Sequence, residues 1–499
     1  MRRLVLLSLL CVASVHGAAP AYVALATEDP RTERLAAAAA RILSRKELAG
    51  ASVGVDIRSL TRGERIWSRN ADRGFAPASN LKLVTLHLAL AVLGPGFEFE
   101  TPLVADGPIV EGGRLEGDLW VRGSGDPTLQ PCFFESEDES APLRPFVQAL
   151  ALQGVKRIAG DLVVDARAFD EVLVPEGWPA DQLDHDYAAP VSALSLDGNC
   201  LRVRVTARAA LPPLAELRPE VFGWRLENDL AAAAKPDAFQ VALAAVEADG
   251  VVHLRGSVGS EVGVALVTRS VSDPPLYFGL ALRAAVERAG IALGGRVRRA
   301  EGAEQPREKA RTLYTRRSPL LPALHLCGKE SDNNIAEHLL KACALKRFGH
   351  GSWEGGARLV EELARELGID PTALRVVDGS GLSRLDQVTP QFLTALLARA
   401  WDAPWRDDFM RCLPISGVDG TLDKRMSEPA MQCRVRAKTG FISQVSALSG
   451  FALSGDEPEQ ETFTFSILVN GFKGGNAEIK KAQDDLCRAI VALPRAGGE

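Results

Sequence analysis

The chain has 499 residues, of which 46% are hydrophobic and 24% are charged, and its formal net charge is −6. This composition is typical of a soluble protein that is long enough for two or three domains. A nucleic-acid-binding surface needs a clustered basic face, so the slightly acidic balance argues against a nucleic-acid partner.

The N-terminus has the pattern of an export signal. Met1-Arg2-Arg3 precede an apolar run from Leu4 to Val15, and small residues follow at 17–19. This pattern predicts a signal peptide over residues 1–18 and an exported, periplasmic mature protein. A buried N-terminal helix is the alternative interpretation. No other stretch reaches membrane-spanning length without charges, so we expect no transmembrane anchor.

The cysteines and histidines indicate neither a metal site nor a cofactor. Their spacing matches none of the zinc-binding patterns, and we therefore expect no metal and no cofactor. Seven of the eight cysteines follow the signal peptide and would enter an oxidising compartment. Closeness in sequence makes Cys327/Cys343 and Cys412/Cys433 candidate disulfides.

The first hundred residues predict a helix, two strands and a second helix. Residues 31–50 are rich in alanine and leucine and indicate the first helix, whereas residues 51–57 alternate as in a strand. Another strand begins at residue 64. The run 81–93 is apolar nearly all round and ends at a Gly-Pro-Gly sequence, which predicts a buried helix.

From about residue 100 to residue 290, short strand patterns alternate with Gly-Asp turns. Residues 114–121 and 157–164 look alike, since each has a basic residue, then Gly-Asp-Leu, then a β-rich run. We interpret them as two copies of one small unit. This region, residues 101–289, is expected to form one or two inserted β-rich domains.

The last part of the chain returns to helices and then to strands. Residues 301–318 are interpreted as a solvated connector. One helix is expected at 276–289, before this connector. Four more helices are expected after it, at 319–326, 334–344, 357–368 and 387–400. The strands are expected at 433–438, 445–453 and 462–470. The strand pattern is that of an antiparallel sheet. The fold class is therefore α/β, with residues 19–100 and 290–499 forming one discontinuous domain around the insertion.

One charged residue, Lys82, lies inside the apolar run of the second predicted helix. It follows Ser79 by one helical turn on the same face. Burial shifts the pKa of an unpaired ammonium toward neutrality, and a hydroxyl beside such a lysine is an activated nucleophile. The structural alternative is that Ser79 caps the helix and Lys82 extends to the surface. A single Ser-x-x-Lys motif is weak support on its own.

Two further short motifs follow in order. Ser331-Asp332-Asn333 precedes a predicted helix, and Lys438-Thr439-Gly440 ends a predicted strand. Each has a structural alternative, a helix cap for Ser331 and a hairpin turn for residues 438–440. The three motifs in this order are the signature of the penicillin-recognising serine enzymes.

Acyl transfer explains why these residue types occur together. It needs a nucleophile, a base, a proton relay to the leaving amine and an oxyanion hole. Ser79 would be the nucleophile and Lys82 the base, with Ser331 and Asn333 as relay hydroxyl and supporting amide. In the third motif Lys438 and Thr439 would bind a substrate carboxylate, Gly440 would leave room for a substrate strand, and the backbone N–H groups of Ser79 and Phe441 would form the oxyanion hole.

The chain resembles the class C low-molecular-mass penicillin-binding proteins, which are D-Ala-D-Ala carboxypeptidases and endopeptidases. Further matching stretches are residues 123–129, 192–194, 378–384, 417–422 and 445–450. The 252-residue separation of Ser79 and Ser331 also fits this family, which carries small β-rich domains at that position. The resemblance implies a serine β-lactamase/transpeptidase-like domain, an antiparallel sheet flanked by helices.

The resemblance implies an enzyme that hydrolyses peptidoglycan stem peptides through an acyl-Ser79 intermediate and that β-lactams acylate. The alternatives are a β-lactamase or other esterase on the same fold, and a non-catalytic peptidoglycan-binding protein. Phe441 departs from the family pattern, in which a small or hydroxyl residue follows the third motif, and puts substrate preference in question. Glu337, His185 and His338 are interpreted as structural, and residues 378–381 as a substrate-side loop.

Overall fold

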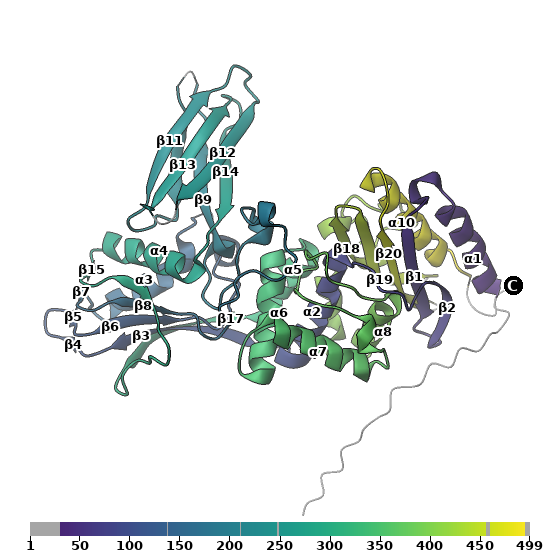
Figure 1. The fold of residues 1–499 in the computed structure, drawn as a ribbon, viewed down its shortest axis with the longest axis horizontal. Coiled ribbons are helices and arrows are strands. Elements are labelled where there is room, and N and C mark those ends of the chain that lie inside the picture. The colour runs from purple at the N-terminus through teal and green to yellow at the C-terminus, as the bar shows by residue number, and fades with distance from the viewer. Residues whose placement is uncertain (1–29, 137, 210, 247–248, 456–459, 495–499) are drawn as a thin grey trace, which may run out of the picture.

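The structure, a computed structural model, describes residues 30–136, 138–209, 211–246, 249–455 and 460–494. The predicted signal peptide lies outside the described residues. Figure 1 shows an elongated molecule with one body of sheet and helices at the right, a second at the left and a β-rich lobe above the second. Among the described residues, no helix combines the length and apolar character needed to cross a bilayer.

The body at the right is built on a five-stranded sheet with the order β18-β19-β20-β1-β2. Every neighbouring pair in it is antiparallel. Its strands are β1 (Ser52–Ser59), β2 (Glu64–Arg69), β18 (Val435–Ile442), β19 (Val445–Ser454) and β20 (Glu461–Asn470). The two ends of the chain therefore build one sheet, as the strand patterns at both ends predicted.

Helices cover both faces of this sheet (Figure 1). On one face lie α1 (Pro30–Leu43) and α10 (Asn476–Val491), whose buried Leu35 and Leu486 share a core cluster with Val55 of β1. On the other face a larger core joins Phe451 and Leu468 of the sheet to a group of helices. These helices are α2 (Lys82–Leu88), α5 (Leu320–Lys329), α6 (Asn333–Phe348), α7 (Trp353–Glu366), α8 (Pro390–Trp401) and α9 (Arg406–Cys412). An antiparallel sheet flanked by helices is confirmed.

The buried helix predicted at 81–93 has three parts with different hydrogen bonding. It begins as a 3-10 turn, η2 (Ala78–Leu81), continues as α2 and ends as a π-helical turn, η3 (Ala89–Leu93). Such departures from α-helical hydrogen bonding occur often at functional sites. We call η2, α2 and η3 together the catalytic helix, because they carry the first motif.

The body at the left contains a second five-stranded sheet with the order β16-β8-β6-β3-β17. Its strands are β3 (Glu98–Asp106), β6 (Asp118–Arg122), β8 (Leu162–Asp165), β16 (Val297–Arg299) and β17 (Arg311–Pro319). Most of β3 lies within residues 101–289, whereas its partner β17 lies after residue 289. The connector predicted at 301–318 is wrong in its second half, which forms β17.

The two similar stretches form a stack of parallel strands. β5 (Arg114–Leu115) pairs with β7 (Arg157–Ile158), and β6 pairs with β8 in the register Leu119↔Leu162. Equivalent residues of the two copies are thus direct neighbours, which confirms the repeat. A third, divergent copy follows, because β15 (Ala292–Leu293) pairs with β7 and β16 pairs with β8 in the same way.

Between the second and third copies the chain forms the projecting lobe of Figure 1. The lobe has two three-stranded sheets with the orders β10-β9-β14 and β11-β13-β12. Its strands are β9 (Cys200–Thr206), β10 (Leu214–Arg218), β11 (Arg225–Ala232), β12 (Phe239–Val246), β13 (Val251–Val258) and β14 (Val264–Ser270). The helices α3 (Arg144–Leu152) and α4 (Pro274–Arg288) share a core with the second sheet through Phe146 and Phe278.

The two predicted disulfides are absent, since all seven cysteines of the described residues are free thiols. Cys412 is buried whereas Cys433 is exposed, and Cys327 and Cys343 lie on different helices. Closeness in sequence does not place two Cβ atoms within bonding geometry. Burial raises the pKa of Cys343 and of Cys412, which keeps these thiols protonated and unreactive.

Candidate active site

Ser79 and Lys82 meet at the start of the catalytic helix. Ser79 lies in the 3-10 turn and is half-buried, and Lys82 is fully buried one turn later. The Nζ atom of Lys82 is 3.0 Å from the Oγ atom of Ser79. The side-by-side placement expected from the spacing is therefore present. The structural alternative of a lysine at the surface is wrong.

Two oxygen acceptors hold the other side of the Lys82 ammonium. Lys82 Nζ donates to Asn333 Oδ1 at 2.7 Å and to the backbone carbonyl of Ser380 at 2.9 Å. Burial lowers the pKa of Lys82, although the nearby Glu337 and Asp378 carboxyl groups act in the opposite direction. The net direction favours a neutral amine beside the serine hydroxyl.

The second motif lies at the start of α6. The cap of this helix is Asp332, whose side chain accepts the N–H of Ile335 at 2.8 Å, so the interpretation of Ser331 as the cap is wrong. Ser331 itself has a positive φ of 66°, a strained conformation for a non-glycine residue that is common at functional sites. Asn333 bridges two parts of the chain, because its amide also donates to the carbonyl of Tyr187 at 2.8 Å.

The third motif lies inside β18 and not in a turn. The strand continues to Ile442, past the predicted end at residue 438, and the hairpin turn falls at residues 443–444. Lys438 is fully buried, and its Nζ atom donates to the carbonyl of Thr439 at 3.0 Å. Burial and the neighbouring Lys82 both lower the pKa of Lys438. The hairpin-turn interpretation of residues 438–440 is therefore wrong.

β18 is an edge strand, and among the described residues no backbone hydrogen bond covers its outer side at Phe441. Residues 414–416 cover the first part of this edge. Ser416 N donates to Val435 O at 2.9 Å, and Ala437 N donates to Pro414 O at 3.0 Å. Backbone groups of alternate residues face the same edge. The backbone N–H and C=O of Phe441 therefore face outward beyond the covered part. The Phe441 side chain is 54% exposed.

Gly440 allows β18 to lie directly against the start of the catalytic helix. A Cβ atom at this position would be 2.9 Å from Pro77 O and 3.0 Å from Ser79 N. The amide of Asn80 reinforces the contact by donating to Lys438 O at 2.9 Å. The missing side chain is thus required by this backbone contact, which the sequence interpretation of Gly440 as room for a substrate strand did not anticipate.

The loop at residues 417–422 supports Thr439. The Thr439 hydroxyl donates to Thr421 Oγ1 at 2.8 Å. Asp419 fixes the loop, because it accepts from Lys329 Nζ at 2.6 Å and from Ile415 N at 2.9 Å. Thr421 is a site residue that the motifs do not contain, although the resemblance had included its stretch.

The loop at residues 378–383 lies behind Lys82, so its interpretation as a substrate-side loop is wrong. Ser380 is fully buried, and its carbonyl accepts from Lys82. Glu337 and His338 are buried on α6 and have structural contacts, as expected. Glu337 bonds the backbone N–H of Gly379, and His338 bonds Ser195. In the described part of the chain, no group of three or more His, Cys, Asp or Glu residues could hold a metal ion.

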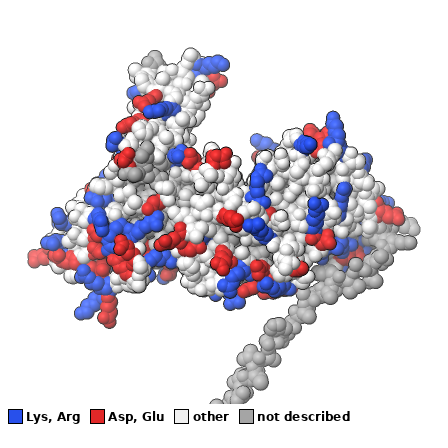
Figure 2. Space-filling view, in the orientation of Figure 1, with Lys and Arg blue, Asp and Glu red and all other residues white. Residues whose placement is uncertain are grey.

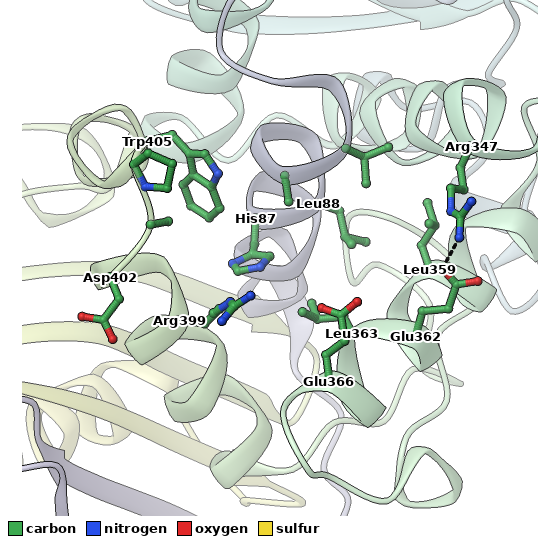
Figure 3. A pocket seen from close by; sticks show the side chains of 14 residues that line it. His87, Leu88, Arg347, Leu359, Glu362, Leu363, Glu366, Arg399, Asp402 and Trp405 are labelled. Atoms are coloured by element: carbon green, nitrogen blue, oxygen red, sulfur yellow. Dashed lines mark ion pairs between the residues drawn. The ribbon is translucent and has the colours of Figure 1, made fainter. Parts of the chain in front are cut away.

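A hollow of about 550 Å³ lies near the end of the catalytic helix that is far from Ser79 (Figure 3). Its lining includes His87, which packs edge-on against Trp405 with ring centroids 5.0 Å apart. The ring of His87 is buried, and burial lowers its pKa to about 4. None of the motif side chains lines this hollow, so it is separate from the candidate active site.

A protein with this fold and these three motifs around one lysine is a serine peptidase of the penicillin-recognising class. The chain belongs to the D-Ala-D-Ala carboxypeptidase 3 (S13) family, whose model matches residues 35–492. It is a serine-type D-Ala-D-Ala carboxypeptidase, and the resemblance seen in the sequence is confirmed.

Individual relatives agree with the family assignment. A D-alanyl-D-alanine carboxypeptidase from Actinomadura sp. (strain R39) is 33% identical over 87% of this chain and 80% of its own length. The carboxypeptidase DacB from Haemophilus influenzae is 28% identical over 88% of this chain and 89% of its own. A crystal structure of penicillin binding protein 4 (dacB) from that organism covers 91% of this chain and 99% of its own, with a TM-score of 0.75 and 25% identity.

Proposed function

We propose that Ser79 is the nucleophile and Lys82 the general base of this enzyme, and that its substrates are the D-Ala-D-Ala ends of peptidoglycan stem peptides. The same site would cleave cross-linked stem peptides and would be acylated by β-lactams. The hydrogen bonding of Lys82 is the observation that supports this proposal most strongly.

The three partners of Lys82 decide which way its lone pair points. Asn333 Oδ1 and the Ser380 carbonyl can only accept hydrogen bonds, so each takes one N–H of the amine. A neutral amine has two N–H groups and one lone pair. With both N–H groups engaged, the lone pair faces the third partner, Ser79 Oγ, at 3.0 Å. Lys82 is then placed to accept the serine proton.

The acylation step follows from this arrangement. Lys82 takes the proton of Ser79, and Oγ bonds to the carbonyl carbon of the penultimate D-Ala. The N–H groups of Ser79 and Phe441 hold the resulting oxyanion. When the C–N bond breaks, the leaving nitrogen receives the proton through the hydroxyl of Ser331, and free D-alanine departs from the acyl-Ser79 ester.

Deacylation uses the same base. Water attacks the ester carbonyl, Lys82 accepts the water proton, and the proton returns to Ser79 Oγ as the ester bond breaks. The products are the enzyme and a stem peptide shortened by one residue. No further carboxylate base is required, since Lys82 already contacts the serine oxygen at 3.0 Å.

The open edge of β18 would bind the substrate as an added antiparallel strand. Phe441 would pair with the peptide backbone next to the scissile bond. On substrate binding the Thr439 hydroxyl, which donates to Thr421 Oγ1 in the structure, would turn its proton to the terminal carboxylate, and the Thr421 hydroxyl would then donate to Thr439 Oγ1. The bound carboxylate would favour the protonated form of the buried Lys438, against the burial that lowers its pKa, and Lys438 would then compensate the charge of the carboxylate from behind this hydroxyl.

Endopeptidase activity needs room for a larger leaving group. Beyond residues 414–416, the outer edge of β18 is open and the Phe441 ring is more than half exposed. These features support cleavage of a peptide whose leaving amine belongs to a second stem peptide. A substrate in the cell wall also requires export, and we infer that residues 1–18 are a removed signal peptide and that the enzyme acts in the periplasm.

The test is the release of D-alanine from a synthetic stem pentapeptide and the cleavage of cross-linked muropeptide dimers. The wild-type protein is expected to carry out both reactions, and Ser79→Ala neither. Release of D-alanine without dimer cleavage would refute the endopeptidase part. Activity in Ser79→Ala would refute the assignment of the nucleophile.

A further inference from the structure

We infer that two buried carboxylates, Glu337 and Asp378, are positioning residues that aim backbone carbonyls of the 378–383 loop at the catalytic helix. Neither touches the substrate in the proposed mechanism. The inference rests on the proposed role of Lys82 and adds to it the part of the structure that sets the direction of the Lys82 lone pair.

Glu337 holds the first part of the loop by its backbone donors. Its two carboxylate oxygens accept the N–H of Gly379 at 2.7 Å and the N–H of Ser380 at 2.8 Å. The indole of Trp353 donates to the same carboxylate at 2.7 Å. Glu337 is fully buried, and these donors account for its polar atoms without solvent.

Asp378 holds the second part of the loop in the same way. It accepts the N–H of Gly381 at 2.6 Å and the N–H of Ser383 at 2.7 Å. The indole of Trp178 donates to it at 2.9 Å. Each carboxylate thus binds two backbone N–H groups of the loop and one tryptophan.

The geometry of the trans peptide bond links these contacts to the catalytic helix. In a trans peptide the N–H points away from the carbonyl of the preceding residue. Because Asp378 binds the N–H of Gly381, the Ser380 carbonyl points the other way, and there it accepts from Lys82 at 2.9 Å. Because Glu337 binds the N–H of Ser380, the Gly379 carbonyl points to Thr85, whose hydroxyl donates to it at 2.6 Å.

A close backbone contact makes this arrangement rigid. Gly381 has a φ of 80°, and a Cβ atom there would be 1.9 Å from the carbonyl oxygen of Ala78. The loop therefore lies directly against the turn that carries Ser79. A displaced loop would move the acceptor of Lys82 and rotate the amine away from Ser79.

Several titratable groups surround Glu337, Asp378 and Lys82. From α6 they include Asp332 and Lys341, from the continuation of the loop Asp386, from α5 the thiol of Cys327 and from β18 Lys438. Glu337 and Asp378 both raise the pKa of Lys82, against the larger effect of burial. Burial and the neighbouring Asp378 raise the pKa of Glu337 to about 7, so Glu337 carries its charge above that pH. Removing the charge of Glu337 or of Asp378 should lower the pKa of Lys82.

The experiment measures the pH dependence of acylation by benzylpenicillin in Glu337→Gln and Asp378→Asn. An amide of the same shape keeps one acceptor and turns a donor toward the loop N–H groups. A misplaced base costs about 10- to 100-fold in rate, so the plateau rate constant is expected to fall by about this factor. The acid limb of the profile is expected to move to lower pH, which a loss of folded protein alone would not cause.

The matched control is Glu461→Gln. Glu461, at the start of β20, is also a buried carboxylate, but it pairs with Arg31 of α1 and Ser59 of β1, away from the site. This variant should stay within about twofold of the wild type in rate, with no shift of the acid limb. Wild-type rate and profile in folded Glu337→Gln and Asp378→Asn would overturn the inference.

A second pair of variants tests the positioning role of the 378–383 loop if the amide variants do not fold. Thr85→Val removes the hydroxyl that holds the Gly379 carbonyl, whereas Thr85→Ser keeps it. We expect slower acylation in the valine variant alone, and equal rates in both would overturn the inference.

Lys82→Ala separates this inference from the proposed function. Acylation that survives Lys82→Ala would refute the base itself, whatever the loop variants show.

Discussion

Gly440→Ala should move the catalytic helix away from β18 and open the oxyanion hole. The added Cβ atom would be 2.9 Å from Pro77 O, 3.0 Å from Ser79 N and 3.1 Å from Asn80 N. Ordinary contacts begin at 3.4 Å, so the turn has to retreat by about 0.5 Å, the difference between 3.4 and 2.9 Å. All three atoms belong to the backbone, and no side-chain rotation can relieve the contact.

The retreat separates the two N–H groups that would hold the oxyanion. Loss of one oxyanion donor costs about 10²- to 10³-fold in rate, and a partial displacement should cost about 100-fold, or about 2.7 kcal/mol of transition-state stabilisation. Overpacking should also lower the free energy of unfolding by about 1–3 kcal/mol.

The assay is the second-order rate constant of acylation by benzylpenicillin, measured together with thermal unfolding. Gly96→Ala is the matched control, because a Cβ atom at Gly96 meets nothing within 4 Å. The control should react at the wild-type rate. If a folded Gly440→Ala variant acylates within twofold of the wild-type rate, the oxyanion hole does not depend on the close contact between β18 and the catalytic helix, and the reasoning is refuted.

Three further predictions test the base, the oxyanion donor and a buried histidine. The acylation rate should rise with pH as Lys82 loses its proton, with a midpoint below pH 10.5, because burial lowers the pKa of Lys82. A profile from stopped-flow measurements with its midpoint at or above pH 10.5 would contradict this. Phe441→Pro removes an N–H that faces the open edge and should slow acylation by about 10²- to 10³-fold, whereas Phe441→Ala keeps the N–H and should acylate within a few-fold of the wild type; equal rates in the two variants would exclude this N–H as a donor. Burial lowers the pKa of His87 from 6.5 to about 4, so the stability that depends on the neutral ring is complete above pH 6.5 and is lost as the pH falls toward 4, by about 3 kcal/mol. His87→Phe should flatten this fall in denaturant unfolding, and an unchanged slope would contradict the origin of the effect.

The α/β class and the three motifs could be recognised in the sequence because both depend on local patterns of residues. The strands at both ends alternate in hydrophobicity, and the two Gly-Asp-Leu copies share one register in the second sheet. The third copy at residues 292–299 was missed, because it lacks the Gly-Asp pair and only its register with β7 and β8 shows the relation.

Other parts of the site depend on contacts between distant segments. Ser380 follows Lys82 by 298 residues, and its contribution is a backbone carbonyl, which has no signature in sequence. Thr421 supports Thr439 through a loop that folds back from the start of β18. The predicted disulfides failed for a similar reason, since neighbouring positions in sequence fell on different elements.

The charge distribution is also a property of the folded surface. Figure 2 shows acidic and basic side chains interspersed over the visible face, with no broad area of one sign. The terminal carboxylate of a stem peptide would be bound by local groups at β18, where Thr439 and Lys438 lie.

The central claim is that Ser79 forms the acyl-enzyme. Its most direct test is the intact mass of the mature protein after incubation with benzylpenicillin, followed over hours beside Ser79→Ala. We predict a long-lived adduct of one penicilloyl group in the wild type and none in the variant. Rapid loss of penicillin without a lasting adduct, still dependent on Ser79, would indicate a β-lactamase. An adduct of equal amount in Ser79→Ala, or no reaction in either protein, would contradict the claim.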